Sequence, residues 1–375
     1  MSNRQRWLPA AALLLPLALL AGCAAEPAPA PAPGESAPST ESPYGGALGT
    51  PEEEAAFQAL YDEAIAAGQK QVVVYGPPPA RALLDTFHER FPGIEVTYQQ
   101  LQSAERLAKL EQEKQTGNFV ADIASDGRTP VVSLGVDGWC QPLDHIMDVP
   151  AEWLGVDDSV QFQQVAVFGM AVNTDLLDVA DAPKSWQELT SAEWAGKVVM
   201  VTPAAGGAAA FTFAQMDYPE ANNEKYAGIK EGIKENVTLV AKDALVLQEV
   251  ASGNYPIGAL AYYPYFVEIK AQGAPIEFVF PFAEGGGNMW TKSAQCLLND
   301  SPNPLAASLY MYWEFSKEGQ QALSDAGLYP VMPGTPGPGG LPPLDTVELL
   351  EQLPDIEAIT AYGPYVKDVI DFFTE

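Results

Sequence analysis

Short apolar segments alternate with amphipathic segments between residues 71 and 125, and this order constrains the fold more than any other feature. Strand-length apolar runs and helical faces follow one another at Gln71–Tyr75, Arg81–Phe91, Ile94–Tyr98, Ser103–Gln115 and Val120–Ser125. In the helix expected at Ser103–Gln115, Leu107 and Leu110 are predicted to face inward. Strands joined by helices pair in parallel through right-handed crossovers. The pattern therefore predicts an α/β fold with a mostly parallel sheet flanked by helices.

The same alternation returns after a middle segment, which predicts a second lobe. Strands are expected at Lys197–Thr202 and Pro256–Tyr262, and helices at Gly207–Met216, Asp243–Ser252, Asn303–Phe315 and Glu318–Ala326. Thr50 is a candidate N-cap for a helix whose first turn contains Pro51. The chain from Pro51 to Glu375 is longer than one typical domain of about 100 to 200 residues, so its length also fits two lobes.

The N-terminus resembles a bacterial lipoprotein signal. Two arginines precede the apolar run Leu8–Leu20, and small residues precede Cys23. Residues 1–22 are therefore expected to be a signal peptide, with cleavage before Cys23 and lipidation of its sulfur. The alternative is a transmembrane helix, but the run is shorter than the roughly 20 apolar residues that span a bilayer, and it contains two prolines. Residues 23–50 are rich in proline and alanine and are expected to be a tether.

The formal net charge of −30 argues against two classes of partner. Nucleic acids and anionic lipid surfaces would both repel so acidic a chain. The acidity is compatible with a role in solubility alone, and a cationic ligand is the second interpretation.

Two cysteines remain if Cys23 carries lipid. Cys140 and Cys296 would then form an even pair in an oxidising compartment, where a disulfide between them is the economical assignment. The alternative is that they are two buried thiols that never meet.

Several short motifs carry a resemblance to a known family, and their order covers roughly residues 71 to 332. They are Val72–Gly76, Glu89–Val96, Ala121–Ile123, Gly138–Leu143, Asn173–Asp175, Pro183–Leu189, Trp194–Lys197, Gly273–Glu277 and Ser316–Gln320. In this order they resemble the extracellular solute-binding proteins of ABC importers, in the branch of ferric-ion, thiamine and phosphonate receptors.

The resemblance implies a two-lobed, periplasmic-binding-protein-like fold that closes on a solute about a hinge. Lobe 1 would comprise residues 51–150 plus about 278–332, and lobe 2 would comprise about 151–277. Residues 333–375 are expected to be a Pro/Gly loop and a C-terminal helical region, and the tail after Pro343 departs from the alignment. The implied role is a monomeric receptor that delivers its solute to an ABC transporter permease. The alternative is a ligand-sensing or adhesion lipoprotein of the same fold that signals to a membrane partner.

Two candidate ligand sites follow strands of lobe 1. Gly76 and Pro77 come after the first strand, at the edge where α/β sheets present ligands, although a plain connection is the alternative. Ser125, Asp126 and Arg128 follow the third strand on the same edge. Arg128 can clamp a carboxylate or phosphonate, and Asp126 can meet an amine or a metal, unless the two pair with each other.

Two more candidate sites belong to lobe 2. The loop containing Thr202, Gly206 and Gly207 leads into a helix whose backbone N–H groups can cradle an anion, with a tight turn as the alternative. Tyr262 and Tyr263 end a strand where ferric-ion receptors of the family have adjacent tyrosines, so Tyr262, Tyr263 and Asp126 are the candidate metal ligands if Fe(III) is the transported ion. Otherwise the tyrosines would line an organic-ligand pocket.

Enzymatic activity is not expected. The chain has two histidines, His88 and His145, and neither has the spacing of a metal or catalytic motif. No nucleotide-binding lysine follows the glycine loop at Gly206. The sequence therefore implies no cofactor.

Overall fold

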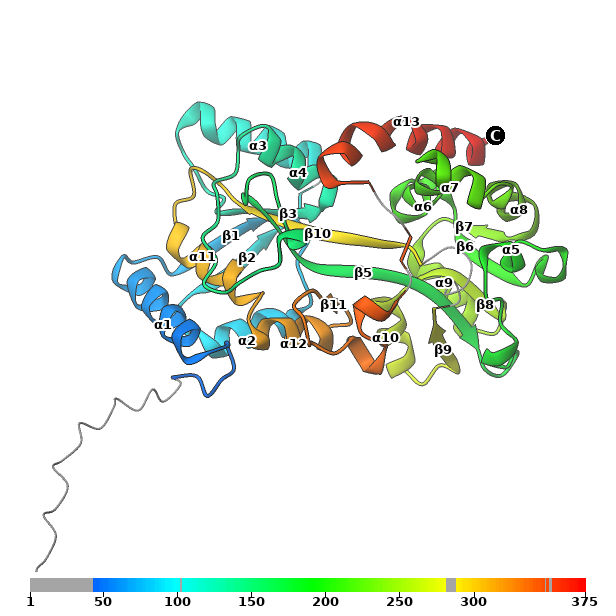
Figure 1. Cartoon of the computed structure of the whole chain (residues 1–375), viewed down its shortest axis with the longest axis horizontal. Coiled ribbons are helices and arrows are strands. Elements are labelled where there is room, and N and C mark those ends of the chain that lie inside the picture. Colours follow the sequence, from blue (N-terminus) through cyan, green and yellow to red (C-terminus); the bar gives the residue numbers. More distant parts are fainter. Residues whose placement is uncertain (1–42, 102, 281–287, 348, 351–352) are drawn as a thin grey trace, which may run out of the picture. The chain divides into compact units, whose positions relative to one another are not determined.

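The computed structural model describes residues 43–101, 103–280, 288–347, 349–350 and 353–375 (Figure 1). The expected signal peptide, the lipidation site Cys23 and most of the expected tether lie outside these residues. Among the described residues, no helix has both the length and the apolar character needed to cross a membrane.

The first subdomain is built on three parallel strands. β1 (Gln71–Tyr75) lies between β2 (Glu95–Gln99) and β3 (Ile123–Gly127) and pairs with both in parallel, as the alternation predicted. Its helices are α1 (Pro51–Ala66), α2 (Arg81–Arg90), α3 (Ser103–Thr116), α4 (Arg128–Val136), α11 (Pro304–Trp313) and α12 (Lys317–Asp325). α1 begins where expected, because the Thr50 side chain and Glu53 form a reciprocal capping box.

Two details of this subdomain differ from the expectation. β3 begins later than expected and continues to Gly127, because β10 (Trp290–Leu297) pairs with it in antiparallel fashion and extends the ladder past Asp126. Asp126 is therefore a strand residue and not a loop residue. On α3, Leu110 is buried as expected, but Leu107 is 36% exposed, so the inward face of this helix is narrower than its apolar residues suggest.

The second subdomain contains β6 (Val198–Val201), β7 (Thr238–Val240) and β8 (Ile257–Tyr262), with β6 parallel to both neighbours. The helices of this part are α5 (Trp186–Leu189), α6 (Gly207–Asp217), α7 (Glu220–Lys225), α8 (Ile229–Asn236), α9 (Asp243–Ala251) and α10 (Tyr263–Ala271). Its hydrophobic core includes Trp186, Met200, Phe213 and Leu247, and is separate from the core of the first subdomain around Phe87, Phe91, Tyr310 and Trp313.

Two long strands join the subdomains. β5 (Val160–Asn173) pairs with β10 near its start and with β8 and β9 (Ile276–Val279) near its end, all antiparallel. The strand order is β2-β1-β3-β10-β5-β8-β6-β7, and the short strands β4 (Leu154–Gly155) and β11 (Tyr329–Pro330) also pair with β5. Figure 1 shows β5 and β10 passing together from one subdomain to the other. The sheet is thus parallel within each subdomain and antiparallel where the two are connected.

The remaining elements are short, except for the last helix. 3₁₀ helices occur at η1 (Ala151–Trp153), η2 (Val179–Asp181), η3 (Ala192–Trp194), η4 (Pro203–Ala205), η5 (Pro338–Gly340) and η6 (Leu344–Thr346). α13 (Asp355–Thr374) contacts α6 and η4 of the second subdomain and α4 of the first (Figure 1). Val369 of α13 is fully buried in the core of the second subdomain.

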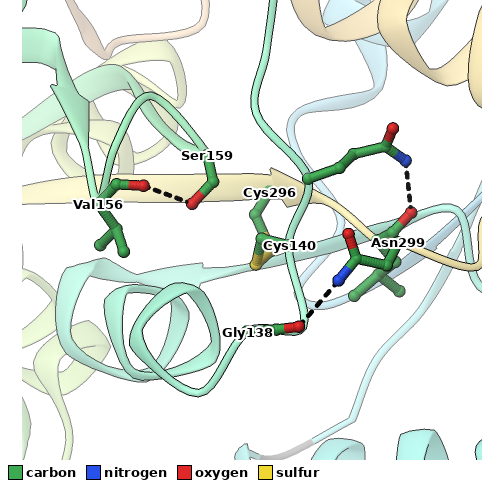
Figure 2. The surroundings of a disulfide bond; sticks show 8 residues. Gly138, Cys140, Val156, Ser159, Cys296 and Asn299 are labelled. Carbon is green, nitrogen blue, oxygen red and sulfur yellow. Dashed lines mark hydrogen bonds between the residues drawn. A yellow bond between two sulfur atoms is a disulfide. The ribbon is translucent and has the colours of Figure 1, made fainter.

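A disulfide joins Cys140, which follows α4, to Cys296 of β10 (Figure 2). The two Cα atoms are 5.7 Å apart. Both cysteines lie in a small apolar cluster of the first subdomain that also contains Val131 and Phe162. Beside the disulfide, the side chain of Asn299 donates to the carbonyl of Gly138 at 2.8 Å and fastens the same two segments together.

His145 should make the protein sensitive to acid. Its ring packs against Tyr312 and Phe315, and neither ring nitrogen has a hydrogen-bond partner among the described residues. Burial lowers the pKa of His145 to about 4. The unfolded chain therefore takes up this proton first, and stability is lost as the pH falls from about 6.5 through about 4, by about 3 kcal/mol in total. Urea unfolding at several pH values should show a smaller acid loss for His145→Leu, and parallel curves for the two proteins would contradict this account.

Candidate functional site

A cleft of about 430 Å³ lies between the two subdomains, with the connecting strands as its floor. Gln163 and Gln164 of β5 and Ser293 and Gln295 of β10 belong to this floor. One wall comes from the loops and strand ends of the first subdomain, and the other from the junction of β8 and α10. The cleft is therefore assembled from segments that are far apart in the sequence.

Pro77 lines the first wall, but Gly76 does not. Gly76 is buried, and a Cβ atom at this position would lie 2.1 Å from the carbonyl oxygen of Ser125. The close approach that requires glycine is therefore between the ends of β1 and β3, and not between the backbone and a ligand.

Ser125 and Asp126 also line the first wall. The Asp126 carboxylate forms an ion pair with Arg106 of α3 at 2.8 Å, and Arg106 also donates to the carbonyl oxygen of Ser125 at 3.2 Å. Arg106 is only 1% exposed, so it stabilises the end of β3 from the interior of the protein. Arg128 begins α4, is 7% exposed and is not part of the lining.

Glu314, the residue that follows α11, adds an acidic side chain to the floor formed by β5 and β10, and it is 1% exposed. The Gln295 amide donates to its Oε1 at 3.2 Å. Burial raises the pKa of Glu314 to about 8, although hydrogen bonds from Gln295 and Tyr310 oppose the shift. The cleft therefore holds a mostly protonated carboxyl group near neutral pH.

Three buried oxygen atoms of the floor have no hydrogen-bond partner among the described residues. They are Oε1 of Gln163, Oε1 of Gln295 and Oε2 of Glu314. Buried polar groups are satisfied in the great majority of native structures, so each exception calls for an explanation such as a bound molecule.

The second wall contains Tyr262, Tyr265 and Glu268. The rings of Tyr262 and Tyr265 meet edge to face, with centroids 5.1 Å apart. Burial raises the pKa of Tyr262 to about 12, so its phenol is neutral under ordinary conditions. Glu268 is exposed at the rim.

Tyr263 lies apart from the cleft, in the core of the second subdomain. Its ring packs against Phe266 and Phe278, and a Cβ atom on Gly339 would lie 2.1 Å from its hydroxyl oxygen. Tyr262 is the last residue of β8 and Tyr263 the first of α10, and the chain turns between them. The structure therefore places Tyr265, and not Tyr263, beside Tyr262.

The expected anion cradle also lies outside the lining of the cleft. The Thr202 hydroxyl accepts from the N–H of Ala204 and caps η4, which contacts α13. Gly206 and Gly207 have φ values of +78° and +61°, so glycine serves a left-handed turn into α6 here. This geometry corresponds to the alternative of a tight turn.

The charged side chains among the described lining residues of the cleft are all acidic. Among the described residues that line it, Asp126, Glu268 and Glu314 are acidic, and none is lysine, arginine or histidine. No group of three or more His, Cys, Asp or Glu side chains in the described part of the chain is placed to hold a metal ion. The arrangement suits a solute that brings hydrogen-bond donors or positive charge.

The residues that form the floor of the cleft were not predicted as site residues, and neither was Arg106, which pairs with Asp126. Glu314 had a recognisable signal, because it is a lone acidic residue after the apolar and aromatic run of α11. Gln163 and Gln295 interrupt buried strands, which is a weaker signal. Arg106 is indistinguishable in the sequence from a surface charge of α3.

Comparison with known proteins gives a consistent result. The model of a family described as bacterial extracellular solute-binding protein matches residues 82–339. Iron-bound HitA from Pseudomonas aeruginosa is 20% identical, with a TM-score of 0.65 over 80% of this chain and 99% of that one. The ferric binding protein from Campylobacter jejuni is 19% identical, with a TM-score of 0.64 over 80% and 99%. AfuA from Actinobacillus pleuropneumoniae, with bound fructose-6-phosphate, is 18% identical, with a TM-score of 0.58 over 81% and 97%.

These solved structures share the α/β periplasmic-binding-protein fold with this chain. The expected fold class is thereby confirmed. Their bound solutes differ from one another, an iron ion in one case and a sugar phosphate in another. Similarity at this level of identity establishes the fold, and the solute has to be argued from the cleft itself.

Proposed function

Because the chain belongs to the bacterial extracellular solute-binding proteins, a family without enzymatic activity, we propose that it is a membrane-anchored receptor that captures a small solute in its cleft and delivers it to an ABC transporter permease. The observation that carries this proposal is the cleft between the subdomains, because its two walls belong to separate cores and its floor is formed by the strands that connect them. Rotation about β5 and β10 would bring the walls together on a solute.

The two subdomains correspond to the lobes in this proposal. The first lobe comprises residues 51–150, the first half of β5 with Val160 and Phe162, and about 278–332. The boundary expected near residue 150 therefore moves to about the middle of β5, and the second lobe extends from there to about residue 277. Closure converts solute occupancy into a shape that a permease can distinguish. The pairing of β10 with β3 and of β9 with β5 supports a lobe boundary near residue 280.

The anchor in this proposal is a lipid on Cys23, with residues 24–50 as the tether. The composition of that segment supports it, because proline-rich and alanine-rich chains extend without forming a core. A receptor held in this way meets its permease repeatedly at the outer face of the membrane.

The proposal is tested by asking whether the protein carries a solute and closes on it. The protein is purified from its native membrane and denatured, and the released small molecules are identified by mass spectrometry. The recovered solute, added back to refolded protein, should raise the melting temperature and reduce the radius of gyration in solution scattering. Recovery of no solute, or binding without compaction, would contradict a closing receptor. Crosslinking in the membrane should capture a permease, and capture of a sensor kinase instead would favour a signalling role.

A further inference from the structure

The electrostatic character of the cleft disfavours anionic solutes. The acidic residues that line it are Asp126, Glu268 and Glu314, and Asp126 forms an ion pair with the buried Arg106. A phosphate or carboxylate would enter a low-dielectric cleft in which no cationic side chain among the described lining residues receives it. An anionic solute is therefore disfavoured.

The floor requires hydrogen-bond donors. The unpartnered acceptors are the amide oxygens of Gln163 and Gln295, and Oε2 of Glu314 becomes a third when this carboxyl group is ionised. The three residues are only 3%, 2% and 1% exposed. All three residues line the cleft. A molecule with several N–H groups would satisfy acceptors that the protein itself leaves open.

The walls favour an organic molecule over a bare ion. Tyr98, Tyr262 and Tyr265 line the cleft, and aromatic faces attract cationic groups. The volume of about 430 Å³ matches a small organic solute. A ferric site would need several charged ligands together, whereas Tyr263 is buried elsewhere and Asp126 is already paired with Arg106.

We infer that the solute is a small organic cation with several N–H donors, a primary or secondary ammonium compound, whose charged group is seated on Glu314 between Gln163 and Gln295. This inference rests on the proposed function and narrows its solute class. The tyrosines of the walls enclose the remainder of the molecule.

Binding of such a cation should release a proton. Burial raises the pKa of Glu314 to about 8, and an ammonium group beside it would favour the carboxylate. Affinity should therefore rise about tenfold for each pH unit up to about pH 8 and then level off. The titratable groups that face Glu314 are the phenols of Tyr98 and Tyr310, whose pKa values burial raises well above the usual range, and Asp126 and Glu268 lie in the walls of the cleft.

The test is isothermal titration of the purified full chain with spermidine, putrescine and cadaverine between about pH 6 and pH 8, in two buffers of different ionisation enthalpy. The expected result is binding of at least one of these cations with proton release. Glu314→Gln keeps the shape of the side chain and should lower the affinity at about pH 8 by at least tenfold and abolish both the pH slope and the proton release. Glu89→Gln, the same change at an exposed residue of α2, should alter neither.

The results that would contradict the cationic solute differ from those that would contradict the receptor function. If ferric citrate, inorganic phosphate or fructose-6-phosphate binds and the cations do not, the receptor remains and the cationic solute is wrong. If a cation binds and Glu314→Gln retains its affinity and pH slope, Glu314 is not the seat. If none of the six compounds binds and no small molecule is recovered from the native protein, the receptor itself is contradicted. Melting curves of both variants show whether each remains folded.

Discussion

Replacing both Cys140 and Cys296 by alanine should lower the free energy of unfolding by about 5 kcal/mol. The disulfide closes a loop between residues 156 apart in the sequence, and a crosslink restricts the unfolded chain more when the loop is longer. Urea unfolding under non-reducing conditions measures the loss. The same loss should appear when the wild-type protein is unfolded with a reductant.

The double variant supplies the control for this experiment, because a reductant should leave its stability unchanged. A wild-type protein that is insensitive to reductant would contradict the prediction. Solute affinity is a second readout, since Cys296 is adjacent to Gln295 on β10 and the crosslink fixes the strand that forms the floor of the cleft.

The second large effect is expected at Asp122, which is fully buried just before β3. Its Oδ2 accepts from the N–H of Val73 at 2.8 Å, and its Oδ1 accepts from Ser301 Oγ at 2.7 Å and from the N–H of Asn303 at 2.8 Å. Asp122→Ala would leave these donors buried without an acceptor. We expect a loss of about 4 kcal/mol in the free energy of unfolding.

Asp137→Ala is the matched control for Asp122→Ala, because it removes the same group from an exposed position at the end of α4. Its stability should stay within about 0.5 kcal/mol of the wild type. Equal effects of the two substitutions in urea unfolding would mean that the network around Asp122 does not bind β1 to the start of α11.

The local elements could be predicted from the sequence because their signals are local. β1 has the expected bounds, α2 and α9 end one residue earlier than expected, and α12 is shifted by one residue toward the N-terminus. The connecting strands β5 and β10 were not predicted as strands, since their pairing joins residues more than a hundred positions apart and depends on the assembled sheet. No periodicity in a short window encodes that contact.

In the candidate site too, residues placed by local elements were predicted, and residues placed by long-range pairing were not. Pro77, Ser125, Asp126 and Tyr262 line the cleft, because the carboxyl ends of strands in an α/β sheet meet at one edge. The direction of a side chain at a strand-to-helix junction depends on the turn itself, and Tyr263 therefore lies in the core. The acceptors of the floor come from the unpredicted strands and from the end of α11.

The contacts of α13 have a consequence for the energetics of capture. This helix packs against α4 in one subdomain and against α6 and η4 in the other, so each relative orientation of the subdomains has its own packing free energy along α13. Binding of the solute must supply the difference in packing free energy between the open and the closed orientation. The apparent affinity is the intrinsic affinity multiplied by the fraction of solute-free receptors that are already closed. Substitutions on α13 that touch no solute can therefore set the concentration range over which this receptor responds.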